Sequence, residues 1–248
     1  SLMPFNMSSN NHLKPGSVVA KQDRFKFVVA GPQHIDQIIG FLGEYHYPQV
    51  VTLQSLVTDF KSFAESLRND TLLQLQDGMS FIIEDDLTGD LVGLAISHWM
   101  HQNLGKYFLK LADDYSDHGS FYHWRLLAAL YQDLDLFKLY DTSTVLHGRV
   151  YSLKPSVQNI GLKKTFGRIA GLSDLPLFSH VSRKGVVICC EANGKFANRL
   201  MDAVGYAVLN KVSYPDFEVN GIYPFRDIAS KTPHTFASLR VLKTKSKL

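Results

Sequence analysis

The sequence predicts a single-domain, mixed α/β fold, a β-sheet flanked by helices, and two observations lead to this fold class. Along 25–243, apolar residues alternate between the period of a strand and the period of an amphipathic helix. The segments follow one another roughly as βα-α-ββ-α-βα-βα-β-β, with no internal repeat or interior linker. We therefore expect one domain at 25–243, a flexible polar tail at 1–24 and a short tail at 244–248.

The first half of the chain opens with a strand at 25–29 and a helix carrying apolar residues from Ile35 to Leu42 at helical spacing. A second apolar stripe at 53–67, preceded by Thr52 as a candidate N-cap, predicts one helix of four turns. Two strand-like segments then flank a polar turn at 85–90 and predict a β-hairpin.

In the second half, 102–118 lacks clean periodicity, whereas 124–134 has a helical apolar face. The remaining segments predict a strand at 145–153, a helix along Leu162, Phe166, Ile169 and Ala170, a buried strand at 186–190, a helix at 196–204 ended by Gly205, and strands at 206–214 and 235–243.

Composition excludes several classes of protein. The 26 Lys and Arg against 23 Asp and Glu give a net charge of +3, too small for a basic nucleic-acid footprint. No apolar stretch is long enough to span a bilayer and no signal peptide opens the chain, so we expect neither membrane insertion nor secretion. Cys189 and Cys190 are adjacent, which favours a reducing intracellular compartment.

The stretch 148–164 places a polar turn containing Gly161 between a strand and a helix. Free backbone N–H groups at a helix N-terminus bind phosphate or pyrophosphate, and a glycine allows close approach of the backbone. The alternative is a simple turn that contains Pro155.

At this stretch the sequence resembles the GNAT superfamily of acyl-CoA N-acyltransferases, and within it the dopamine and other arylalkylamine N-acetyltransferases of invertebrates. The family pattern Gln/Arg-x-x-Gly-x-Gly/Ala is in register from Gln158 to Leu162, and a second marker runs from Glu191 to Tyr206. The resemblance implies a splayed mixed sheet, with acetyl-CoA in the gap between the strands that end at Leu153 and Cys190.

The resemblance also implies a set of residues that bind acetyl-CoA, with no metal. They are Tyr151, Ser152, Leu153, Gln158, Asn159, Ile160, Gly161, Leu162, Lys163, Asn193 and Phe196. Lys163 departs from the family pattern, which has Gly or Ala there. Its side chain would either crowd the pyrophosphate or pair with it.

Acetyl transfer requires a neutral amine, so a group near the site must accept a proton. The resembling enzymes use a glutamate shortly after the first helix, and this chain has no carboxylate at the matching place. Glu44 and His46 lie nearby and are the candidates, although a lone histidine beside aromatic residues is more often a packed or surface residue. Asn193 and Ala197 stand where those enzymes have serines, and Met201 where many relatives have a tyrosine acid.

These substitutions leave backbone polarisation of the thioester carbonyl near Ser152 and Leu153, with Asn193 as an amide donor. Aromatic residues predict either an apolar acceptor pocket or core packing, namely Tyr45, Tyr47, Phe121, Tyr122 and Trp124. We expect no metal site, because His98 and His101 are three residues apart on a strand and point to opposite faces.

The triplet Ser246-Lys247-Leu248 matches the address that the peroxisomal import receptor reads. It predicts a peroxisomal protein, the alternatives being a lysine-rich tail and a cytoplasmic protein.

Taken with the resemblance, the sequence predicts direct acetyl transfer from acetyl-CoA to a small amine, an arylalkylamine or a polyamine being candidates. A catalytically degenerate module that binds CoA or a partner is the alternative, because the familiar catalytic residues are absent. A nucleic-acid-binding protein has only the weak positive charge in its favour.

Overall fold

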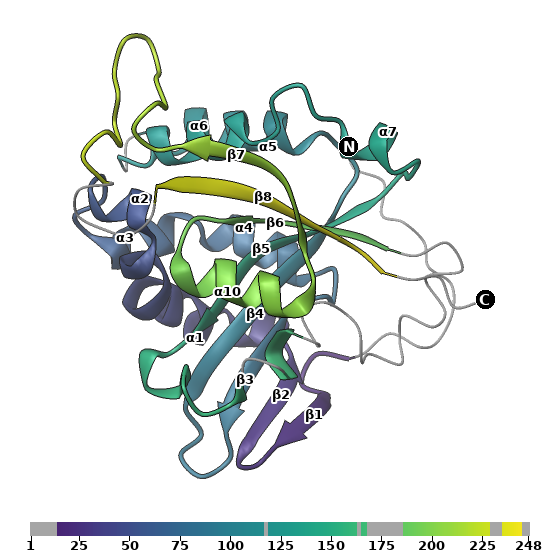
Figure 1. The fold of residues 1–248 in the computed structure, drawn as a ribbon. Coiled ribbons are helices and arrows are strands. Elements are labelled where there is room, and N and C mark those ends of the chain that lie inside the picture. Colours follow the sequence, from purple (N-terminus) through teal and green to yellow (C-terminus); the bar gives the residue numbers. More distant parts are fainter. Residues whose placement is uncertain (1–13, 117–118, 163–164, 168–185, 229–234, 245–248) are drawn as a thin grey trace.

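The computed structural model describes residues 14–116, 119–162, 165–167, 186–228 and 235–244 (Figure 1). Its eight strands form one sheet in the order β1-β2-β3-β4-β5-β6-β8-β7. The strands are β1 (Val18–Gln22), β2 (Phe25–Val29), β3 (Phe81–Asp85), β4 (Leu91–Met100), β5 (Val145–Leu153), β6 (Val187–Ala192), β7 (Ala207–Ser213) and β8 (Phe236–Lys243). The helices are α1 (Ile35–Phe41), α2 (Val51–Gln54), α3 (Phe60–Ser66), α4 (Arg68–Leu75), α5 (Leu104–Asp114), α6 (Phe121–Ala129), α7 (Leu136–Leu139) and α10 (Lys195–Val204).

The sheet is mixed, as the sequence predicts. Neighbours from β1 to β5 are antiparallel, β5 and β6 are parallel, and β6, β8 and β7 are again antiparallel. The parallel step is possible because a long connection separates β5 from β6, whereas the β3–β4 pair is the expected hairpin.

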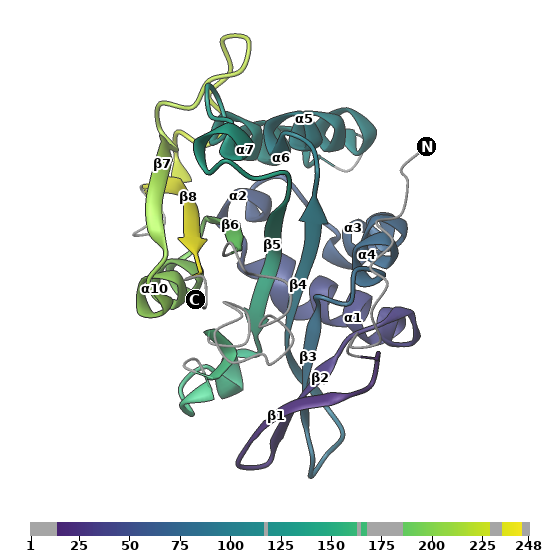
Figure 2. The ribbon, with the colours of Figure 1, turned by 90° about the vertical axis from the view of Figure 1, so that its right-hand side faces the viewer.

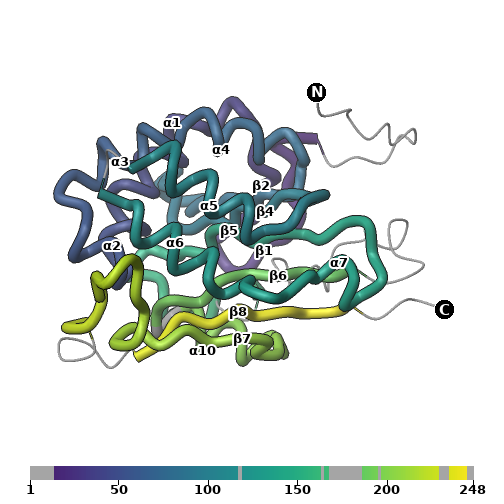
Figure 3. The backbone as a smooth tube through the Cα atoms, turned by 90° about the horizontal axis from the view of Figure 1, so that it is seen from above, coloured from purple at the N-terminus to yellow at the C-terminus, as the bar shows by residue number. Residues whose placement is uncertain are grey.

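Helices cover both faces of the sheet, so the central strands are buried on both sides (Figure 3), whereas the edge strands β1 and β7 are partly exposed. Helices α1 to α6 lie on one face, where Phe63, Phe108 and Trp124 pack against strand residues such as Leu94. Helix α10 lies on the other face, where Leu200 packs in a second apolar cluster. Each cluster removes apolar surface from water, and together they fix the strands that carry the functional residues.

The sheet opens between β5 and β6, and Figure 2 shows β6, β8 and β7 turning away from β5. The two strands are paired only from Leu146 with Ile188 to Gly148 with Cys190. Beyond Gly148, five residues of β5 continue along β4 without a partner on the β6 side. This opening is the splayed gap that the resemblance implies.

The prediction of one continuous helix at 53–67 is wrong. Helix α2 ends at Gln54, and α3 starts anew after Asp59, whose carboxylate accepts hydrogen bonds from the N–H groups of Lys61 and Ser62. The predicted apolar face is confirmed, since Leu53, Phe63 and Leu67 are fully buried. An N-cap carboxylate inside the stripe overrides the periodicity.

Two other predictions differ from the structure. Helix α5 lies in the stretch without clean periodicity, capped by Asn103, because Leu104, Phe108 and Leu111 still share one buried face. Strand β1 lies within the segment expected as a flexible tail and pairs with β2, so that expectation is wrong for Val18–Gln22.

Several predictions fall outside the described residues: Lys163, the helix positions Ile169 and Ala170, and the triplet Ser246, Lys247 and Leu248. Among the described residues, no helix combines the length and the apolar character needed to cross a bilayer.

Candidate functional site

The backbone of β5 presents polar groups to the gap. The N–H of Lys154 donates to the carbonyl of Val92 at 2.8 Å, so Lys154 faces β4. Successive residues of a strand direct their N–H and C=O groups to opposite neighbours. The backbone N–H and C=O of Ser152 therefore also point to β4. The backbone N–H and C=O of Tyr151 and Leu153 point to the gap.

A short loop follows β5 at the open end of the gap. After the 3₁₀ turn η5 (Pro155–Val157), Gly161 adopts a left-handed conformation with φ +81°, and Leu162 begins the next helical segment. A Cβ built on Gly161 would meet Gln22 Nε2 at 3.7 Å, so the glycine is needed for its backbone angle and not for lack of space. Asn159 and Ile160 are exposed. Among the described residues, the N–H groups of Asn159 and Gly161 have no hydrogen-bond acceptor.

The segment after α1 packs against the start of this loop. A π-helical turn, η2 (Leu42–His46), and a 3₁₀ turn, η3 (Tyr47–Gln49), follow α1 directly. Lys154 Nζ lies 4.7 Å from the ring centroid of Tyr45, and Gln158 Nε2 donates to Gln49 Oε1 at 3.5 Å and to the Leu153 carbonyl at 3.1 Å. The segment that contains His46 is thereby held beside the end of β5.

The environment of His46 disfavours it as a proton acceptor. Burial lowers the pKa of His46 to about 3, and the charge of Arg149 acts in the same direction. A base of that pKa does not hold a proton near neutral pH. Of the other two candidates, Glu44 is exposed, and Asn193 follows β6, where its carbonyl accepts a hydrogen bond from the Tyr214 hydroxyl at 3.1 Å. Nothing in the described residues brings Glu44 and Asn193 into contact.

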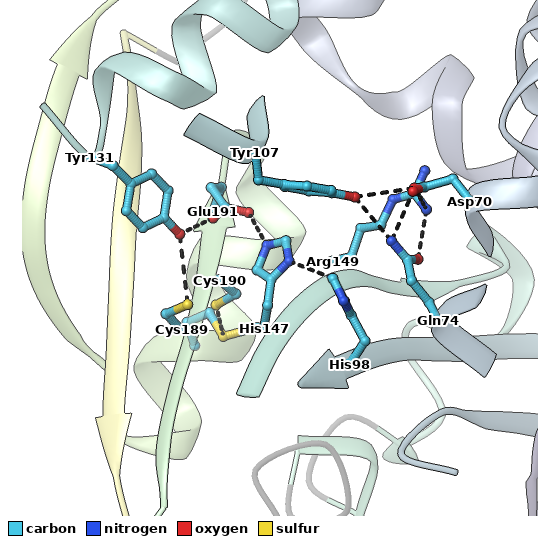
Figure 4. A network of polar contacts seen from close by, with 11 residues as sticks. Asp70, Gln74, His98, Tyr107, Tyr131, His147, Arg149, Cys189, Cys190 and Glu191 are labelled. Carbon is cyan, nitrogen blue, oxygen red and sulfur yellow. Dashed lines mark hydrogen bonds and ion pairs between the residues drawn. The ribbon is translucent and has the colours of Figure 1, made fainter. Parts of the chain in front are cut away.

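A buried polar chain crosses the sheet where the gap begins (Figure 4). His98 Nε2 lies 3.0 Å from His147 Nδ1, and His147 Nε2 lies 2.9 Å from Glu191 Oε2. The hydroxyl of Tyr131 donates to Glu191 Oε1. The side chains of His147 and Glu191 are 0% and 5% exposed, so water does not compete for these contacts. Burial lowers the pKa of His98 and raises that of Tyr131.

Sequence reasoning missed this chain. It compared His98 with its near neighbour His101, whereas the register of β4 and β5 places His98 opposite His147. The signal was present in two histidines on adjacent predicted strands and a glutamate at the end of a third, but only the register brings them together.

A second polar cluster surrounds Arg149 on the same face of the sheet (Figure 4). Its Nη1 donates to Asp70 Oδ2 at 2.9 Å and to Gln74 Oε1 at 2.7 Å, both on α4. The Tyr107 hydroxyl donates to the same Asp70 oxygen at 3.1 Å. Because Asp70 accepts two charge-assisted bonds, the cluster ties α4 and α5 to β5.

The aromatic residues considered for an acceptor pocket belong to the core. Tyr47 and Trp124 are each 4% exposed and lie within the large apolar cluster, and Tyr45, Phe121 and Tyr122 pack against it. The structure therefore favours the core-packing alternative for the rings of these residues. Among the described residues, no group of three His, Cys, Asp or Glu side chains could hold a metal ion.

No protein-family model matches the sequence, and no curated protein is similar to it in sequence. Solved structures are similar in fold. Arylalkylamine N-acetyltransferase 2 from Aedes aegypti superimposes with a TM-score of 0.73 at 18% identity, over 90% of this chain and 100% of that one. The polyamine N-acetyltransferase of Drosophila melanogaster, which forms N-acetylagmatine, has a TM-score of 0.70 at 15% identity, over 89% of this chain and 100% of that one. An agmatine N-acetyltransferase mutant has a TM-score of 0.70 at 17% identity, over 90% of this chain and 100% of that one.

The chain has the GNAT fold. The three structures named above are N-acetyltransferases, and each is covered over its whole length. The GNAT fold accounts for the one parallel step in the sheet and for the gap that follows it. At this level of identity the fold is shared, while the side chains that line the gap are this chain's own.

Proposed function

We propose that this protein is an acetyl-CoA-dependent N-acetyltransferase that transfers acetyl directly to a small amine. The observation that carries the proposal is the gap between β5 and β6, which leads to a glycine loop in a GNAT fold. The fold alone is compatible with many activities, so the residues at the gap must also fit the donor.

The residues around the gap fit acetyl-CoA. The unpaired N–H groups of Asn159 and Gly161 lie at the start of a helical segment, where a diphosphate is favoured. The backbone of Tyr151 and the N–H of Leu153 offer hydrogen-bonding groups to an extended amide chain, as a neighbouring strand would. When bound, acetyl-CoA supplies a thioester whose acyl carbon the amine nitrogen attacks, with the thiol as leaving group.

The chain's own task is then to take the proton that the ammonium of the acceptor must lose. His147 and Glu191 are the pair suited to this task, because Glu191 directly follows the last paired residue of β6, where the gap opens. Both ring nitrogens of His147 are engaged, Nδ1 with His98 and Nε2 with Glu191, so a proton enters this pair by relay along the chain of hydrogen bonds. Tyr131 holds the other carboxylate oxygen of Glu191 and so fixes its orientation.

A CoA-binding module without catalysis is the second candidate. Ala197 and Met201 stand where the resembling enzymes carry hydroxyl groups, and Met201 is 2% exposed in the core under α10. Neither side chain donates a proton, so this candidate predicts binding of acetyl-CoA without turnover.

Two measurements distinguish these candidates. Acetyl-CoA at a hundredfold its dissociation constant adds about 2.7 kcal/mol to the free energy of unfolding, which raises the melting temperature by roughly 5 to 10 °C in a chain of this size. Release of the CoA thiol is then followed with a panel of amines, against the rate in buffer. A melting shift with amine-dependent release supports the transferase, and a shift without release supports the binding module. If acetyl-CoA does not change the melting temperature, both candidates are contradicted.

A further inference from the structure

Arg149 stands at the opening of the gap because β5 contains a bulge. Ile96 of β4 pairs with Val150, and Ser97 pairs with Gly148, so Arg149 is an extra residue between them. A bulge redirects a side chain and is common beside functional sites. Arg149 is also the first residue of β5 beyond the last pair with β6, so the bulge lies where the gap begins.

The guanidinium of Arg149 uses only part of its hydrogen-bonding capacity. Asp70, Gln74 and Thr71 all accept from Nη1, at 2.9, 2.7 and 3.5 Å. Nη2 is buried and has no hydrogen-bond partner among the described residues, in a side chain that is only 6% exposed. A buried donor left unpaired is unfavourable by about 1 to 3 kcal/mol, more for a charged group, so an acceptor for Nη2 is missing.

Tyr47 carries a second buried polar atom. Its side chain is 4% exposed, and among the described residues no hydrogen-bond partner lies within 3.5 Å of its hydroxyl. Burial raises the pKa of Tyr47, while the charge of Arg149 and a long side-chain contact with Arg149 lower it, so the two polar groups are neighbours without a close hydrogen bond between them. Tyr47 follows directly on the π-helical turn Leu42–His46. Such turns are rare and occur frequently at functional sites.

Around Arg149, Asp70 is the acidic group in direct contact, and three nearby histidines carry no charge. Burial lowers the pKa values of His46, His98 and His123, and Arg149 lowers them further, so all three are neutral near pH 7. Burial by itself lowers the pKa of Arg149, but Tyr47 and Asp70 outweigh it, so the guanidinium stays charged. Asp70 binds at Nη1, which leaves Nη2 free on the other branch of the fork.

We propose that Nη2 of Arg149 and the hydroxyl of Tyr47 bind a carboxylate of the acceptor, so that the acceptor is an amine that also carries a carboxylate, such as an amino acid. A carboxylate accepts from both groups at once, and a guanidinium suits its planar geometry. A polyamine would instead bring a second ammonium toward Arg149, and like charges repel. The proposal rests on the proposed N-acetyltransferase function and names its substrate class.

The test compares phenylalanine with phenethylamine, which differ only in the carboxylate, and includes spermidine. Binding of each amine is measured by calorimetry with CoA at saturation, and thiol release from acetyl-CoA is measured separately. We expect phenylalanine to bind roughly tenfold or more tightly than phenethylamine. We expect Tyr47→Phe to reduce this ratio several-fold, since it removes only the hydroxyl, and Arg149→Lys to reduce it further.

Tyr206→Phe is the matched control, because Tyr206 also has a buried hydroxyl without a partner but lies in the apolar cluster on the other face of the sheet. It should leave the ratio unchanged. The carboxylate proposal is overturned if the two amines bind equally or if neither binds. It is also overturned if Tyr47→Phe leaves the ratio unchanged, which would mean that Arg149 Nη2 and the Tyr47 hydroxyl hold water only. Selective binding of phenylalanine without any thiol release would instead refute the transferase function.

Discussion

Gly161 is the residue at which the backbone itself restricts the choice of side chain. Its φ of +81° lies in the left-handed region, as does that of Gly89, at +74°, in the β3–β4 turn. Neither position lacks space for a methyl group, because the nearest atom to a Cβ lies at 3.7 Å for Gly161 and beyond 4 Å for Gly89. The two glycines therefore differ in location and hardly at all in local strain.

This similarity makes Gly161→Ala and Gly89→Ala a matched pair. Each should lose about 1 to 2 kcal/mol of stability from left-handed strain. Only Gly161→Ala should also weaken acetyl-CoA binding, roughly tenfold, because the loop would shift the N–H groups that meet the diphosphate. Calorimetric titration with acetyl-CoA checks this, and equal affinity in the two variants would argue against the loop as the diphosphate site.

His123 gives a prediction on stability. It is 4% exposed and hydrogen-bonded to Thr52 at 2.7 Å, and burial lowers its pKa to about 3. Below about pH 6.5 the unfolded chain binds a proton at this histidine and the folded protein does not. The free energy of unfolding therefore decreases as the pH is lowered from about 6.5 toward 3. From pH 7 to pH 5 the loss from this residue is roughly 2 kcal/mol.

His123→Gln keeps a partner for Thr52 and should reduce the pH dependence between pH 7 and pH 5 by about that amount. The exposed His101, changed in the same way, serves as control and should leave the dependence as it is. Urea unfolding at the two pH values measures both. An unchanged dependence in His123→Gln would show that this ring is protonated in the folded state.

At the scale of elements, β4, β5 and β6 each contribute one member to the chain of His98, His147 and Glu191. The chain depends on strand register, since a shift of one residue would move each side chain to the other face. The same three strands also define the gap. The proton-accepting pair and the donor site are therefore fixed by one arrangement of strands.

Glu191→Gln tests the proton-accepting pair, because the amide keeps the size of the side chain and an oxygen for Tyr131. We expect kcat for the best amine to fall by roughly 10² to 10⁴, with acetyl-CoA affinity unchanged, since the loss is in proton transfer. Glu44→Gln, on an exposed carboxylate that the sequence suggested, should leave kcat unaltered. If Glu191→Gln retains full kcat while Glu44→Gln loses it, the assignment is reversed.

At the scale of the whole molecule, the sheet consists of two parts joined by the short pairing of β5 and β6. A ligand in the gap replaces the missing strand partner of β5. Acetyl-CoA should therefore slow amide hydrogen exchange in 151–153 and 158–162 more than in the β2–β3 pair, which lies away from the gap. Exchange measured by mass spectrometry with and without acetyl-CoA checks this, and equal slowing in both regions would contradict binding in the gap.

Local sequence patterns predicted most of the strands, the loop around Gly161 and the apolar faces of the helices. Prediction failed where a local signal was weaker than its tertiary context. Asp59 ends an apolar stripe by capping α3, and Val18–Gln22 forms a strand because the edge of β2 is available to it. His46 satisfied the sequence criterion for a base by its ordinary pKa, and burial near Arg149 removes that property.

The sequence by itself determined the order of most strands and the position of the glycine loop, because these depend on side-chain period and on backbone angles within a few residues. The tertiary structure alone decided which polar groups meet. His98 and His147 are 49 residues apart, His147 and Glu191 are 44 apart, and Asp70 and Arg149 are 79 apart. No local pattern encodes such contacts, because strand register, one β-bulge and the burial of α4 against the sheet bring them within hydrogen-bonding distance.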